Sequence, residues 1–84
     1  MSFPRKWESR ILGLIETLGA IGDEKIAPLF LQWMKHPNSH VRSAAATAAS
    51  QAGILAKKDW IPYLEDPAET VRLAAVRGLG NQFF

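Results

Sequence analysis

The chain contains no cysteine, which excludes disulfide bonds and thiolate metal sites as sources of stability. It has no apolar run near the roughly 20 residues of a membrane span, and no signal-peptide core follows its basic N-terminus. Its net charge is only +2, and its ten basic residues are scattered along the chain. These absences predict a soluble, cytoplasmic protein and give little support to a nucleic-acid partner.

What the chain does have is core material, because 48% of its 84 residues are hydrophobic. A chain of this length forms one small domain, residues 1–84, which must be stabilised by packing alone. No stretch alternates apolar and polar residues with the period of a β-strand over more than a few positions. Only helices are therefore predicted.

Two similar segments lie 30 positions apart, HPNSHVRSAAATAAS at residues 36–50 and DPAETVRLAAVRGLG at residues 66–80. They share a proline, a Val-Arg pair and an alanine pair at the same spacing. Another 30 positions back, an apolar stripe with helical spacing persists at Ile11, Leu14, Ile15 and Leu18. A period of 30 to 31 residues is typical of helical repeats, and it predicts about two and a half of them, at 3–22, 23–53 and 54–84.

Each repeat divides into helix, turn and helix. The first helix is expected to run from Phe3, with Ser2 as its N-cap, to Leu18, where Gly19 and Gly22 end it. The predicted starts of the later helices are Asp23, Ser39, Asp59 and Glu69 or Thr70, and the predicted ends are His36-Pro37, Gly53 and, for the fifth helix, Gly80. Prolines at positions 28 and 62 then fall in first turns, where proline is tolerated.

Apolar spacing identifies the residues expected in the core. In the second helix they are Ile26, Leu29, Phe30, Trp33 and Met34, and in the fourth they are Trp60, Ile61 and Leu64. Phe30 aligns with Trp60 and Trp33 with Tyr63, so aromatic side chains are expected at equivalent core positions. The small residues of SAAATAAS, 43–50, predict that the third helix approaches its neighbours closely and lies at the centre.

The turn Asp-Pro-x-x-x-Val-Arg-x-Ala-Ala at residues 66–75 resembles that of HEAT repeats, in particular the short HEAT-like repeats of bacterial proteins. Val41-Arg42 matches two of the family's positions, and Pro28 lies where the family often has a proline. The resemblance implies an all-α fold, a short α-solenoid of antiparallel helix pairs with about five helices. The chain departs from the pattern at His36 and Lys58, and its leading repeat lacks a first helix and a Val-Arg pair.

The resemblance also implies a ladder between successive repeats, in which the turn aspartate of one repeat meets the helix arginine of the repeat before it. In this chain Asp66 would meet Arg42, and Arg72 would hold the equivalent place in the last repeat. The alternative is that Asp66 only caps a helix and that both arginines are solvated. In either case these residues are architectural rather than chemical.

The sequence contains no catalytic constellation. His36 and His40 are separated by a predicted turn and have no supporting carboxylate, so they are expected to be solvent-exposed rather than metal ligands. Ser39, Ser43 and Ser50 have no histidine and acid partners. The chain is therefore predicted to be non-enzymatic and to hold no cofactor, although HEAT-like DNA glycosylases and phycobilin lyases remain analogies at the level of fold.

Binding is the predicted role. In HEAT-like arrays the second helices line one surface. In this chain, residues 30 positions apart form rows that are expected to point outward on that surface, and Ala46 belongs to one of these outward rows. The predicted partner-binding residues are Arg10, Ser43, Thr47 and Arg77 on that surface and Leu73, Val76, Phe83 and Phe84 at an apolar C-terminal end. The partner is a protein, which can be a second copy of the chain. Alternatively, the terminal phenylalanines fold over their own core, or basic residues converge to bind nucleic acid.

Overall fold

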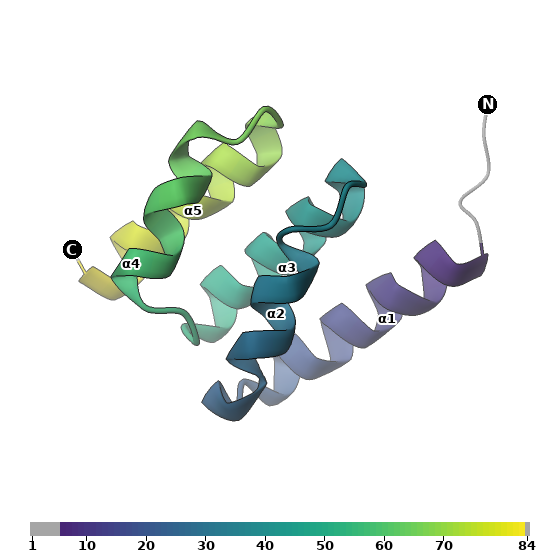
Figure 1. Cartoon of the computed structure of the whole chain (residues 1–84). Coiled ribbons are helices and arrows are strands. Elements are labelled where there is room, and N and C mark those ends of the chain that lie inside the picture. Colours follow the sequence, from purple (N-terminus) through teal and green to yellow (C-terminus); the bar gives the residue numbers. More distant parts are fainter. Residues whose placement is uncertain (1–5, 84) are drawn as a thin grey trace.

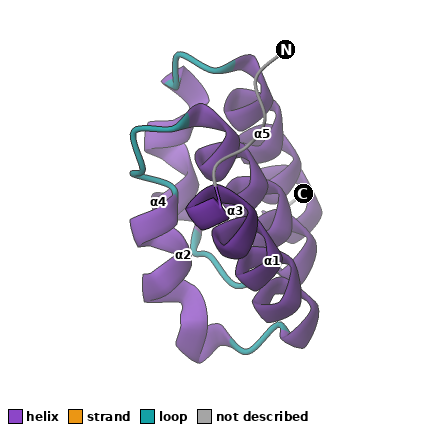
Figure 2. Cartoon of the chain, turned by 90° about the vertical axis from the view of Figure 1, so that its right-hand side faces the viewer, coloured by secondary structure: helices purple, strands orange, loops and turns teal. Residues whose placement is uncertain are grey.

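The computed structural model describes residues 6–83, with side chains up to Gly80. Its elements are α1 (Lys6–Ile21), the 3-10 turn η1 (Glu24–Ile26), α2 (Ala27–Trp33), α3 (Ser39–Ala52), α4 (Lys57–Trp60), the 3-10 helix η2 (Ile61–Glu65) and α5 (Glu69–Phe83). The described residues contain no strand. The helices lie in two layers, α2 and α4 in one and α1, α3 and α5 in the other (Figures 1 and 2). This is the predicted all-α solenoid of antiparallel helix pairs.

The first helix, α1, ends at Gly22 rather than at Gly19. Gly22 has a φ of 68°, in the left-handed region that suits glycine, and its N–H donates to the carbonyl of Leu18 at 3.1 Å. Gly19 lies inside the helix, where a Cβ would stand 2.9 Å from the Cβ of Ala48 in α3. The prediction that Gly19 ends the helix was wrong. This glycine lies within α1, where the absence of a side chain allows α1 and α3 to pack closely. Ser2 and Phe3 lie outside the described residues.

The turn into α2 is closed by Asp23, whose carboxylate accepts the N–H of Lys25 at 2.9 Å, as its predicted capping role requires. Pro28 occupies the first turn of α2, where the missing N–H costs no hydrogen bond. Phe30 and Met34 are fully buried, but Leu29 is 37% exposed. The prediction that Leu29 is buried was wrong, since more than a third of its surface is exposed.

The third helix, α3, is the central one, as predicted. Its N-cap is Asn38, whose side chain accepts the N–H of His40 at 2.8 Å, and Gly53 ends it with a φ of 66°. Packing of α1 on one side and α5 on the other leaves Ala45 and Ala46 with no exposed surface (Figure 1). The prediction that Ala46 points outward was wrong, because Ala46 belongs to the buried core between the helices.

The fourth helix begins earlier than predicted. Its N-cap is Ala56, and the carboxylate of Asp59 accepts the Ala56 N–H at 3.1 Å from within the first turn, so Asp59 supports the cap without being it. Trp60 is fully buried, whereas Ile61 and Leu64 are 52% and 37% exposed and were wrongly expected to face inward. The fifth helix, α5, begins at Glu69 as predicted, but it continues through Gly80 to Phe83.

Candidate functional site

The turns of the second and third repeats are held by equivalent arginines. Nη1 of Arg42 donates to the carbonyls of His36 and Pro37 at 2.8 and 3.0 Å. Nη1 of Arg72 donates to the carbonyls of Asp66 and Pro67 at 2.7 and 3.1 Å. Each guanidinium therefore satisfies two turn carbonyls of its own repeat, and the two sets repeat with the 30-residue period.

The carboxylate of Asp66 joins these two repeats. Arg42 donates from Nη2 to Oδ1 at 3.4 Å, and its Nε lies 3.2 Å from Oδ2 in a contact that is ionic rather than an aligned hydrogen bond. The two side chains are only 15% and 9% exposed, so water screens the pair little. Oδ1 of Asp66 also accepts the N–H of Ala68 at 2.8 Å. Asp66 thus plays both of the roles considered for it, since it contacts the preceding repeat and also caps its own turn.

A groove runs along the layer formed by the second helices, with a volume of about 610 Å³. It is lined from α1 by Glu16, Gly19 and Ala20, from α3 by Ser43, Ala44, Thr47, Ala48 and Gln51, and from α5 by Thr70. Its lining combines small residues with hydroxyls, one amide and one carboxylate. The hydroxyls of Ser43 and Thr70 contact each other across α3 and α5. The groove therefore offers hydrogen-bonding groups over a closely packed apolar base.

The structure brings only some of the predicted partner-binding residues to this groove. Ser43 and Thr47 line it, whereas Arg10 and Arg77 are exposed on the outer helices of the same layer and are not among its lining residues. Glu16, Gln51 and Thr70 line the groove too, although they were not among the predicted binding residues. The signal for Glu16 and Thr70 was present in the sequence, since both stand in the outward rows of the repeat alignment.

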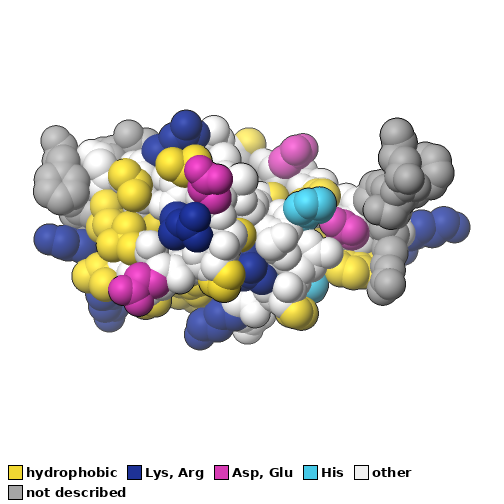
Figure 3. Space-filling model, turned by 90° about the horizontal axis from the view of Figure 1, so that it is seen from above, with side chains coloured by type: hydrophobic (Ala, Val, Ile, Leu, Met, Phe, Trp, Pro, Cys, Tyr) yellow, Lys and Arg dark blue, Asp and Glu magenta, His cyan; other side chains and the backbone are white. Residues whose placement is uncertain are grey.

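The predicted C-terminal end is apolar on the described residues. Leu73 and Val76 of α5 are 49% and 58% exposed, and Ile61 and Leu64 of the same repeat are exposed too. Figure 3 shows hydrophobic side chains gathered toward the α4–α5 end of the molecule, with charged side chains among them. The side chain of Phe83 and all of Phe84 lie outside the described residues, so their predicted roles stay predictions.

The two histidines belong to the middle repeat, in the turn before α3 and in its first turn. His36 is partly buried, accepts the N–H of Asn38 at its Nδ1 and stacks at 5.5 Å from the Trp7 ring, so its predicted solvent exposure was wrong. Exposed His40 lies with its Nδ1 3.4 Å from the carboxylate of the buried Glu8. The sequence carries no signal that singles out Glu8, because its partner belongs to the next repeat.

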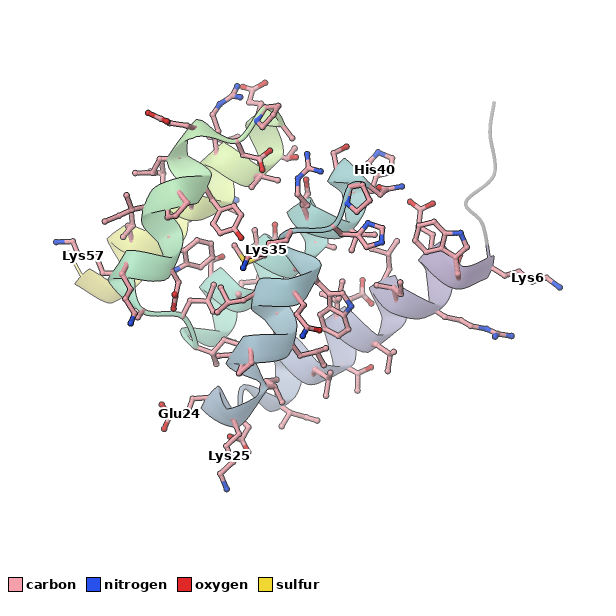
Figure 4. All side chains as sticks on the ribbon, in the orientation of Figure 1. Lys6, Glu24, Lys25, Lys35, His40 and Lys57 are labelled. Carbon is pink, nitrogen blue, oxygen red and sulfur yellow. The ribbon has the colours of Figure 1, made fainter. Side chains whose placement is uncertain are left out.

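No group of three or more metal-ligating side chains occurs in the part of the chain that the structure describes. In Figure 4, Lys6 lies at one end of the molecule and Lys57 at the other, with Lys35 between them. The convergence that phosphate binding requires is therefore not present among these three lysines. None of the helices within residues 6–83 is long and apolar enough to cross a membrane.

Stacked antiparallel helix pairs, turn arginines repeated at a spacing of 30 residues and a groove along the second helices define a helical-repeat solenoid. The family model of HEAT repeats matches residues 8–59, which is more than half of the chain. The chain therefore belongs to the HEAT repeats. No curated protein and no solved structure gives a significant match to it.

Proposed function

We propose that the chain is a non-enzymatic protein-interaction module that binds a polypeptide segment in the groove along α1, α3 and α5. The observation that carries this proposal is the groove itself, in which Thr47 and Gln51 present polar groups over Ala44 and Ala48. HEAT repeats commonly serve as protein-interaction modules, which supports the same role. The hydrogen-bonding walls suit a segment that offers backbone amides, and Glu16 adds a carboxylate for a basic or N–H donor group.

The apolar C-terminal end is part of this proposal as a second protein-binding surface, with Leu73 and Val76 as its described residues. Phe83 and Phe84 extend it as a prediction, as do Arg10 and Arg77 at the edges of the groove layer. A cytoplasmic location and the repeat boundaries 3–22, 23–53 and 54–84 also stay predictions.

The groove can be tested by filling it. Thr47 is exposed in the groove, so Thr47→Arg should block it without disturbing the core. Gln32→Arg is the matched control, because Gln32 is exposed on α2 in the other layer. Proteins captured by the immobilised chain are quantified for the wild type and both variants, with helicity measured by circular dichroism. The proposal expects proteins that bind the wild type and Gln32→Arg but not Thr47→Arg, and equal capture by all three chains would contradict it.

A further inference from the structure

Four large apolar side chains are exposed at one end of the helix stack. Ile61 and Leu64 follow α4, and Leu73 and Val76 belong to α5, with exposed fractions between 37% and 58%. We refer to these four residues as the C-terminal face. Hydrophobic side chains gather toward this end of the molecule in Figure 3, and a large exposed apolar patch often marks an interaction site.

The repeat period shows what kind of structure this face is built to contact. Thirty positions earlier, its four residues correspond to Leu31, Met34, Ser43 and Ala46 in the middle repeat. Met34 and Ala46 are fully buried, and the other two are partly buried. The middle repeat has a neighbouring helix pair on that side, and the last repeat has none among the described residues. The C-terminal face is therefore the equivalent of a surface that a helix pair covers inside this same molecule.

Head-to-tail stacking of copies would extend the solenoid, but the charges oppose it. Within the chain, Arg42 contacts Asp66 of the following repeat. In the leading repeat the position equivalent to Asp66 is Lys6. Head-to-tail stacking would bring Arg72 of one copy to Lys6 of the next, which replaces an ion pair with two like charges.

A two-fold arrangement avoids the contact between Arg72 and Lys6 and covers all four residues of the C-terminal face. Glu69, Leu73 and Arg77 are spaced i, i+4, i+8 along α5 and are all exposed, so they form one ridge. A two-fold axis perpendicular to α5 at Leu73 makes the two α5 helices antiparallel. Leu73 then meets its own copy, and Glu69 of each chain faces Arg77 of the other, so opposite charges flank the apolar centre. The same axis places α4 against α4 of the second copy and covers Ile61 and Leu64.

We propose that the C-terminal face is a homodimer interface, in which a second copy of the chain packs the same face across a two-fold axis at Leu73. This inference deepens the proposed function, because it rests on the assignment of the apolar C-terminal end to protein binding. The interface involves one helix pair from each copy, as in small, transient interfaces, so we expect a weak dimer.

The first experiment measures mass by analytical ultracentrifugation between about 1 and 500 µM, a concentration range in which weak dimers dissociate. Leu73→Glu should weaken the dimer at least tenfold, since two carboxylates meet at the axis. Leu14→Glu is the matched control, because Leu14 is 53% exposed on α1, and it should leave the dimer unchanged. A wild-type chain that stays monomeric throughout would overturn the proposal, as would equal weakening by Leu14→Glu.

The second experiment exchanges the flanking charges. It tests the proposal even if Leu73→Glu fails to fold. Glu69→Arg and Arg77→Glu each place like charges across the axis and should each weaken the dimer several-fold. The double variant restores opposite charges and should recover the wild-type Kd. Circular dichroism checks that all three variants keep their helicity. Double-variant dimerisation that is weaker than in both single variants would overturn the two-fold geometry.

The groove variant Thr47→Arg separates this proposal from the proposed function. Thr47 lines the groove and is not part of the C-terminal face, so Thr47→Arg should dimerise like the wild type. If groove-dependent capture is observed and the chain is monomeric, the groove function holds and the homodimer fails. If the chain dimerises as described but capture does not depend on the groove, the dimer holds and the groove function fails.

Discussion

Gly78 of α5 lies directly against the indole of Trp60, so that a Cβ atom at position 78 would stand 2.6 Å from Cζ2 and 2.9 Å from Nε1 of that ring. Trp60 is fully buried. The 30-residue period places Phe30 at the position of Trp60 and Ala48 at the position of Gly78. Compared with the middle repeat, the last repeat has a larger ring on its first helix and lacks a methyl group on its second helix. The smaller residue makes room for the larger ring, so α4 and α5 remain close.

Gly78→Ala should therefore destabilise the protein, although alanine is the better helix former. The added methyl group has to displace a buried ring, and overpacking of this kind costs about 1 to 3 kcal/mol. Gly80→Ala is the matched control on the same helix, because a Cβ there meets nothing within 4 Å and gains up to about 1 kcal/mol of helix propensity. Urea denaturation followed by circular dichroism measures both, and equal effects at positions 78 and 80 would contradict the role of Gly78.

Ala45 tests the central position of α3. It has no exposed surface, so Ala45→Leu should lower the melting temperature by several degrees through overpacking. Gln51→Leu is the control, since Gln51 is exposed on the same helix and its replacement adds no buried volume. Thermal unfolding of the two variants and the wild type makes the comparison. An unchanged melting temperature for Ala45→Leu would show that the centre of the stack can expand freely.

The sequence predicts the fold well, because helical periodicity and turn residues act over short distances. Gly53 ends α3 as expected, and the small residues of 43–50 do occupy the central helix. Glycine is ambiguous, however, since Gly19 inside α1 and Gly22 at its end look alike in sequence. Only the position of Ala48 on a neighbouring helix distinguishes a glycine needed for close approach from one needed for a left-handed turn.

Burial is harder to predict at the ends of a repeat array than in its middle. Met34 and Leu64 are equivalent by period, yet the first is fully buried and the second is 37% exposed. Both are apolar residues with the same helical spacing, so the sequence predicts the same degree of burial for both. The difference comes from the number of neighbouring repeats. The row alignment placed both Thr47 and Ala46 on the outward surface, and the structure exposes Thr47 but buries Ala46.

Arg42 and Asp66 should be energetically coupled across the repeat boundary. A double-mutant cycle with Arg42→Ala and Asp66→Ala isolates their pairwise contribution from the turn bonds that each residue also makes. For a charge-assisted contact with little solvent screening, we expect on the order of 1 kcal/mol or more. Urea denaturation of the four chains gives this value. Additive single-variant effects would mean that Asp66 acts only through its bond to the Ala68 N–H.

The stability of the protein should fall at alkaline pH through Tyr63. Burial raises the pKa of Tyr63 above its ordinary value of 10.0, and the negative charges of Asp66 and Asp59 raise it further. Above about pH 10 the unfolded chain loses the phenolic proton while the folded chain keeps it, so the free energy of unfolding decreases as pH rises through this window.

Tyr63 is the single tyrosine of the chain, so absorbance near 295 nm follows its ionisation without assignment. Its midpoint should lie above that of the urea-unfolded chain. Asp66→Asn should lower the midpoint without bringing it back to the unfolded value, because burial is the largest cause of the shift. Tyr63→Phe should remove this part of the alkaline loss of stability. Identical midpoints in folded and unfolded chains would show that Tyr63 is as well solvated in the last repeat as it is in water, and would place the alkaline sensitivity elsewhere.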